Sequence, residues 1–237
     1  MSGEYWIPLA IIAGIIGFWF VAVVAACLWE KRPVQPYYVP APGEEYAPSS
    51  VALRENRDAE KLGYRHGGLC HDGKGKLYRV RYDFWIAPDD STIAEVGSGT
   101  VAGIAVNAVW LWSRLAGGRI LCTTSDAGGQ DISGSEDQQT WPGSPFRDLV
   151  EKHQRRLRGL VVEPVPTANP LAAYFDMRRA KFAALVAKGY GYYVDDEQTA
   201  CRYTLKGAIV FYFISAWVRP IGRFLRSVGL VREQSLF

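Results

Sequence analysis

The chain has 237 residues, a net charge of +3, and a composition that is 49% hydrophobic and 22% charged. These values are those of an ordinary globular protein and exclude a wholly disordered chain. The charge is unevenly spread, because residues 202–237 carry six basic side chains and one acidic side chain, Glu233. A basic end of this kind indicates a polyanionic partner, either a lipid surface or a nucleic acid.

The first apolar run extends from Trp6 to Trp29 and contains 24 residues without a charge. About 20 apolar residues in a helix cross a hydrocarbon core of about 30 Å, and a helix bonds all of its own backbone groups. The run therefore predicts a single transmembrane helix over 6–29. Glu4 precedes it and Lys31 and Arg32 follow it, so the positive-inside rule predicts residues 1–5 outside and the main domain cytoplasmic. We interpret this as a bacterial inner-membrane protein at the cell membrane.

Two alternatives concern the same run, and the first, a cleaved signal peptide, would need a basic region before the run and a shorter apolar core. The tetrad Val24 to Cys27 resembles the cleavage box of bacterial lipoproteins, although the bulky Leu28 and Trp29 follow it and no basic residue precedes the run. Small residues also recur along the run and offer a face for close helix approach, which makes a homodimer one hypothesis. They are Ala10, Ala13, Gly14 and Gly17.

Residues 30–50 are predicted to be a proline-rich linker. Five of the eighteen residues in 33–50 are proline. Proline removes backbone donors and fixes φ, so this stretch favours an extended spacer that reaches about 50 Å at ~3.1 Å per residue.

Residues 51–163 are predicted to form a soluble α+β domain. Residues 77–87 alternate between polar and apolar side chains, which is typical of a half-buried strand. Further strands are expected at 92–96, 104–115 and 119–124, giving an antiparallel sheet of about four strands flanked by helices. The composition of 104–115 also allows a helix. Phe146, Leu149, Val150 and His153 lie at helical spacing and predict an amphipathic helix after Ser144.

Residues 164–237 are predicted to be a helical region with a short hairpin and a basic amphipathic end. The apolar run 207–218 reaches only about 18 Å as a helix, which is short of a membrane span. After it, apolar and basic side chains fall on opposite helical faces, which predicts contact with the lipid bilayer through anionic head groups. Packing on the domain and a true second span are the alternatives. The membrane-surface candidates are Arg219, Arg223, Arg226, Phe224 and Leu225.

The cysteine and histidine pattern gives only a weak metal hypothesis. The candidate ligands are His66, Cys70, His71 and Cys122, but their spacing fits no standard zinc pattern. The remaining cysteines, Cys27 and Cys201, are also widely spaced. An odd number of cysteines outside the apolar run favours a reducing compartment. No cofactor is predicted.

Three glycine-containing stretches resemble known motifs in part. Residues 68–74 match GxxxxGK, but glycine follows where a phosphate loop needs Ser or Thr. Residues 95–101, EVGSGTV, resemble the strand-to-helix motif of methyltransferases and Rossmann folds, which would require a helix at 104–115. Residues 171–209 resemble the wing of winged-helix DNA-binding domains, but the following apolar run is unlike a DNA reader, so no nucleic-acid partner is expected.

No catalytic constellation stands out in the sequence. We therefore expect a non-enzymatic binding or scaffolding component at the cytoplasmic membrane. The alternative hypothesis is a membrane-anchored enzyme whose site lies around residues 66–72 or 97–103.

Overall fold

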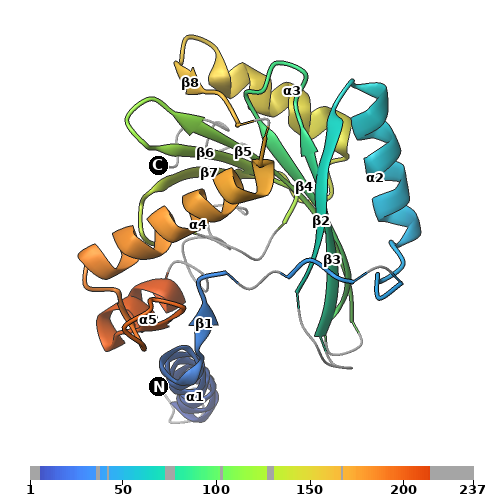
Figure 1. Cartoon of the computed structure of the whole chain (residues 1–237). Helices are drawn as coiled ribbons and strands as arrows, with labels where there is room; N and C mark the ends of the chain where they lie inside the picture. The colour runs from blue at the N-terminus through green and yellow to red at the C-terminus, as the bar shows by residue number, and fades with distance from the viewer. Residues whose placement is uncertain are drawn as a thin grey trace. The chain divides into compact units, whose positions relative to one another are not determined.

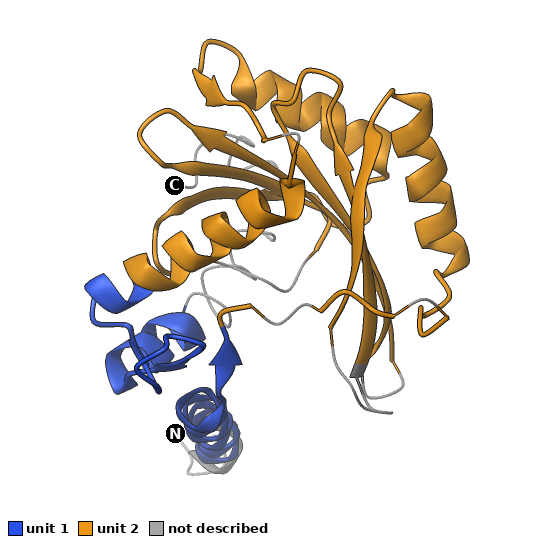
Figure 2. Cartoon of the chain, in the orientation of Figure 1, with its two compact units in different colours: residues 1–33, 185–237 blue, residues 34–184 orange. Residues whose placement is uncertain are grey.

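The computed structural model describes residues 6–35, 38–41, 43–72, 78–101, 104–126, 131–166 and 168–213. Within these ranges the chain is α+β, with a seven-stranded mixed sheet, a three-stranded sheet and five helices (Figure 1). Two compact units can be distinguished, one of residues 1–33 with 185–237 and one of residues 34–184 (Figure 2).

The larger unit is built on the seven-stranded sheet. Strands β2 to β6 follow one another as antiparallel neighbours, β7 lies parallel to β6, and β8 pairs antiparallel with β5. The strands are β2 (Arg65–Asp72), β3 (Tyr78–Ile86), β4 (Ile93–Val101), β5 (Ile104–Leu115), β6 (Ile120–Thr124), β7 (Glu136–Thr140) and β8 (Val162–Glu163). The helices are α2 (Ser50–Lys61), α3 (Phe146–Leu157) and α4 (Pro170–Ala187), whose last residues belong to the smaller unit.

Helices cover both faces of this sheet. Alternate residues of a strand point to opposite faces, and the two buried clusters follow this alternation. On one face, Phe146 and Leu149 of α3 and Ala59 of α2 pack in the cluster that holds Trp85 and Leu111. The other face packs against α4, in a cluster of Phe84, Ile86, Ile93, Tyr174 and Met177.

The predicted fold class needs correction in its sheet. The alternation expected in 77–87 corresponds to β3, and 104–115 is strand β5 rather than a helix. However, a purely antiparallel sheet of about four strands is wrong, since β2, β7 and β8 are added to it and β7 is parallel to β6. The reason is that β2 and β7 carry no apolar alternation and β8 has only two residues. β2 lies in a glycine-rich stretch, and β7 has the polar sequence EDQQT.

The smaller unit contains α1 (Trp6–Trp29), β1 (Arg32–Pro33), β9 (Gly191–Tyr193), β10 (Ala200–Tyr203) and α5 (Leu205–Phe213). Its three strands form an antiparallel sheet in the order β1-β10-β9. The guanidinium of Arg32 lies 4.3 Å from the centre of the Tyr203 ring. Gly207 is required at the start of α5, because a Cβ there would fall 1.9 Å from the carbonyl oxygen of Tyr190.

The predicted membrane helix is also overturned. Among the helical residues that the structure describes, no helix has both the length and the apolarity needed to cross a bilayer. The single transmembrane span at 6–29 is therefore wrong, and so are the single-pass topology and the inner-membrane location inferred from it. The uncharged run does form a helix, but Val24 and Cys27 are buried against the protein and the Phe20 ring contacts Tyr212 of α5 edge-on at 4.9 Å. Other described apolar side chains of this helix, among them Phe18 and Trp19, are exposed. The sequence of an apolar run does not by itself show which surface its side chains contact.

Candidate functional site

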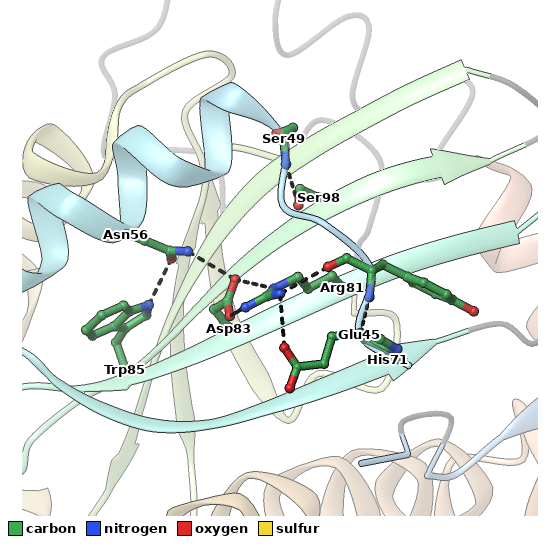
Figure 3. Close-up of polar contacts among 9 residues, drawn as sticks. Glu45, Ser49, Asn56, His71, Arg81, Asp83, Trp85 and Ser98 are labelled. Carbon is green, nitrogen blue, oxygen red and sulfur yellow. Dashed lines mark hydrogen bonds and ion pairs between the residues drawn. The ribbon is translucent and has the colours of Figure 1, made fainter. Parts of the chain in front are cut away.

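A polar network lies on the α2 side of the sheet, where β2, β3 and the segment before α2 meet (Figure 3). We call residues 38–49, described except for residue 42, the strap. The strap crosses β2 and β3 and leads into α2 (Figures 1 and 3). It contributes Tyr38, Tyr46 and Ser49 to the network.

The centre of the network is the ion pair between Arg81 and Asp83 of β3. These residues are two apart on one strand, so their side chains share a face. Arg81 Nη2 lies 2.7 Å from Asp83 Oδ1, and Arg81 Nε donates to both carboxylate oxygens at 3.1 and 3.0 Å. The Asp83 side chain is only 3% exposed, so the guanidinium is needed to offset the cost of burying the carboxylate.

Asn56 of α2 links this ion pair to Trp85. Its Nδ2 donates to Asp83 Oδ2 at 3.0 Å, and its Oδ1 accepts from Trp85 Nε1 at 2.9 Å. Both ends of the amide are thereby used, which fixes its orientation. The contact sets where α2 docks along β3.

His71 of β2 holds the strap by its backbone and by its side chain. Its backbone forms an isolated antiparallel bridge with Tyr38, with hydrogen bonds of 2.8 and 2.9 Å. Its ring is stacked on the Tyr46 ring, with the centroids 4.1 Å apart and the planes 5° from parallel. The Tyr46 N–H donates to His71 Nε2 at 3.2 Å, and Arg81 Nη1 donates to the Tyr46 carbonyl at 3.0 Å.

These contacts determine the tautomer of His71. Because Nε2 accepts a hydrogen bond, the proton of the neutral ring resides on Nδ1. Nδ1 is buried and has no hydrogen-bond partner within the described part of the chain. Burial, and secondly the positive charge of Arg81, lower the pKa of His71 below its ordinary value of 6.5. His71 is therefore a neutral acceptor at pH 7.

The pairing between strap and β2 is limited by a proline. In an antiparallel ladder that continued from Tyr38 and His71, residue 40 would face Leu69. Position 40 is a buried proline, which has no N–H to give to a strand. Within the described residues the bridge at Tyr38 is accordingly an isolated one.

A second polar cluster surrounds His153 of α3, which is 1% exposed. His153 Nε2 lies 2.9 Å from Ser113 Oγ, and Nδ1 lies 2.9 Å from Thr123 Oγ1. Ser113 Oγ donates to the Ser91 carbonyl at 2.7 Å, so it accepts from His153. Arg156 donates to Thr123 Oγ1 at 2.8 Å, which leaves the Thr123 hydroxyl proton for His153 Nδ1.

This arrangement does not activate a nucleophile. Nucleophilic catalysis needs a serine that gives its proton to histidine, whereas the proton of Ser113 is directed to a carbonyl. Burial, with a smaller contribution from Arg156, lowers the pKa of His153 to about 3. His153 therefore joins α3 to β5 and β6 as a buried neutral connector.

The residues of the metal hypothesis are not gathered in one place. His66 is exposed and its ring contacts Trp85 edge-on at 5.2 Å, while Cys70 and His71 are adjacent on β2 and so point to opposite faces. Cys122 lies on β6, four strands from β2, which corresponds to about 19 Å at ~4.8 Å per strand. Among the described side chains, no three His, Cys, Asp or Glu residues are placed to hold a metal ion.

The other residues that the sequence singled out either have a defined place in the sheet or lie outside the described residues. Burial raises the pKa of the Cys70 thiol to about 12, so it is not a thiolate at neutral pH. Residues 95–101 belong to β4 and are followed by strand β5, so the strand-to-helix arrangement of the methyltransferase resemblance is not formed. The predicted membrane-surface residues lie outside the described residues; they are Arg219, Arg223, Phe224, Leu225 and Arg226.

Sequence reasoning missed Tyr46, Asn56, Arg81 and Asp83 as members of a site. The one available signal was the pair of opposite charges at alternate positions of a predicted strand. Comparisons with known proteins identify no matching family, no similar curated protein and no similar solved structure.

Proposed function

We propose that this chain is a non-enzymatic binding or scaffolding protein, and that the outer edge of β2 accepts an extended segment of a partner protein in place of the strap. The observation that carries the proposal is the strap itself. It already lies on this edge in strand geometry, yet Pro40 prevents the ladder from continuing toward Leu69. Addition of a strand to a sheet edge is a common mode of peptide recognition.

The direction of the backbone groups supports this proposal. Both His71 backbone groups bond to Tyr38, so they point away from β3. Orientation alternates along a strand, so the N–H and C=O of Leu69 point to the same outer edge. A partner with an ordinary residue at the position of Pro40 has an N–H that can donate one further hydrogen bond to the carbonyl of Leu69.

An enzyme with a site around residues 66–72 or 97–103 receives less support. His71 uses Nε2 to bind the strap, and the Cys70 thiol has a strongly raised pKa. In the other region, Gly97 and Gly99 lie in β4. A Cβ at Gly97 would fall 2.9 Å from the Tyr82 ring, and a Cβ at Gly99 would fall 2.0 Å from the Arg79 carbonyl oxygen. Close strand packing accounts for these glycines without a ligand.

The test uses a synthetic peptide that copies residues 34–47 with valine in place of Pro40. Its labelled form is titrated with three full-length proteins: the natural chain, Tyr46→Ala and Pro40→Val. The strap competes at an effective concentration in the millimolar range, so its attachment controls the apparent affinity. We expect the tightest binding to Tyr46→Ala, whose strap loses the ring stacking, and the weakest to Pro40→Val, whose strap gains a hydrogen bond.

The matched control is the same peptide with the natural proline. One hydrogen bond contributes about 1 kcal/mol, so the proline peptide should bind roughly fivefold more weakly. Equal affinity of the valine peptide for all three proteins, or no saturable binding at ~1 mM, would contradict the proposed edge.

A further inference from the structure

Among the described residues, the hydrogen bond from the Tyr46 N–H to His71 Nε2 ends on an imidazole nitrogen, which protonation converts from an acceptor into a donor. We propose that protonation of His71 releases the strap from the edge of β2, so that acid opens the site. The release of the strap is argued from the contacts of His71 alone. Its consequence, that a partner can then bind the edge of β2, rests on the proposed function.

Protonation changes the role of Nε2, whereas Nδ1 carries a proton in both states. In the neutral ring, Nε2 accepts from the Tyr46 N–H at 3.2 Å. In the protonated ring, Nε2 is a donor and faces another donor, so the bond is lost. Nδ1 offers no compensation, since it is buried and finds no acceptor among the described residues. The charge would then lie in a closed site against the stacked Tyr46 ring.

The charged groups around His71 act in both directions. Arg81 on β3 opposes protonation, whereas Glu45 of the strap and Asp83 on β3 favour it. Both carboxylates are already engaged, because Asp83 is bonded to Arg81 and Glu45 Oε2 lies 4.0 Å from Arg81 Nη1. Arg81 therefore neutralises much of the negative charge that would otherwise stabilise a histidinium.

The tyrosines and the remaining charged groups complete the surroundings. Tyr38 meets the His71 ring edge-on at 5.7 Å, and its hydroxyl contacts the Tyr46 hydroxyl at 3.3 Å. That contact raises the pKa of Tyr38 to about 12, so the phenol stays neutral. The guanidinium of Arg79 lies 5.6 Å from the Tyr46 ring centre and adds positive charge. Asp72 follows His71 on β2, and its side chain points to the opposite face.

The sign of the effect follows from the pKa. Burial lowers the pKa of His71 while the strap is attached, and departure of the strap exposes the ring to water, which raises the pKa. The released form therefore binds more protons, and attachment weakens as the pH falls below 6.5. The equilibrium shifts by up to tenfold per pH unit until the pKa of the attached form is reached. Above pH 6.5 the attachment does not depend on this group.

The experiment measures hydrogen exchange of residues 38–49 in the full chain between pH 8 and pH 5, after correction for the intrinsic exchange rate. The natural chain should lose protection of the Tyr46 amide below pH 6.5. His71→Gln places an amide oxygen near the position of Nε2 and does not titrate, so protection should persist throughout. His71→Phe retains the ring stacking without an acceptor, so protection should be weak at every pH.

Two results would overturn the proposal: protection of the natural strap that does not change with pH, or the same pH dependence in His71→Gln. The valine peptide then separates this inference from the proposed function. If acid exposes the strap but the peptide binds neither at pH 5.5 nor at pH 7.5, the release is supported and the binding edge is not. If the peptide binds equally at both pH values and protection is constant, the edge is supported and the release is not.

Discussion

Two buried histidines on the same face of one sheet have opposite roles. Both nitrogens of His153 are hydrogen-bonded to hydroxyl groups, at 2.9 Å each. His71 has one bonded nitrogen, and that bond goes to the backbone of the strap. The difference shows that burial alone does not make a histidine structural. The number of satisfied nitrogens, and the segment to which they bond, determine whether protonation affects the core or a removable segment.

The largest expected effect is the loss of the fully bonded histidine. His153→Ala leaves a cavity and removes one hydrogen-bond partner each from Ser113 and Thr123, which are themselves buried. Cavity formation and two weakened polar groups together should lower the free energy of unfolding of the unit 34–184 by about 4 kcal/mol. Urea denaturation at pH 7.5 measures this value. A loss under 1 kcal/mol would mean that the cluster does not join α3 to the sheet.

The second-largest expected effect is the loss of stability in acid that His153 causes. The pKa of His153 is about 3 in the folded chain, against 6.5 in the unfolded one. The unfolded state therefore binds more protons below pH 6.5, and the free energy of unfolding should fall by about 3 kcal/mol from pH 7.5 to pH 4 on this account. His153→Gln is the control, because it removes this titration while carboxylates titrate in both proteins. Equal pH dependence of the two proteins would refute the assignment.

Substitution of His71 should lower the free energy of unfolding less than substitution of His153 does. His71→Ala removes one hydrogen bond of 3.2 Å and the stacking on Tyr46, but it leaves the backbone bridge to Tyr38 intact. We expect a loss of about 1 to 2 kcal/mol in the free energy of unfolding, together with faster exchange confined to the strap. Global loss of exchange protection comparable to that in His153→Ala would remove the distinction between the two sites.

The smallest expected effect is a gain in the stability of the attached strap. Pro40→Val restores an N–H opposite Leu69, and one added hydrogen bond should stabilise the strap by about 0.5 to 1 kcal/mol. The loss of the conformational restriction of proline in the unfolded chain partly offsets this gain. Slower exchange at residues 38–41 is the expected observation. Faster exchange there would show that Pro40 supports the strap rather than limiting its pairing.

Local patterns predicted the parts of the fold that depend on them. The alternation in 77–87 gave β3, and the stripe of Phe146, Leu149, Val150 and His153 lies buried on α3 as its spacing indicated. The polar strand β7 has no such pattern, because ion pairs hold it: Lys181 bonds to Glu136 at 2.9 Å and Arg156 to Asp137 at 2.9 Å. These partners are distant in sequence, so no local periodicity records them.

The candidate site was even less accessible from the sequence. The sequence indicates His71 as a weak metal ligand or as part of an enzyme site at 66–72, although its partner in the structure is a backbone amide 25 residues earlier. The proline content of 33–50 suggested a free spacer, and nothing in it indicates that Tyr38 and Tyr46 lie against one histidine. The prediction of a transmembrane helix at 6–29 was wrong for a related reason, since hydropathy does not indicate which surface an apolar helix contacts.

The most direct test of this account is the tautomeric state of the two histidines, read from the ¹⁵N chemical shifts of their rings at pH 7.5 in the full chain. The hydrogen bonds predict opposite results in one spectrum: His71 with its proton on Nδ1, because Nε2 accepts from Tyr46, and His153 with its proton on Nε2, because Ser113 accepts from it. A proton on Nε2 of His71 would contradict the account, since the ring would then not be the acceptor that holds the strap.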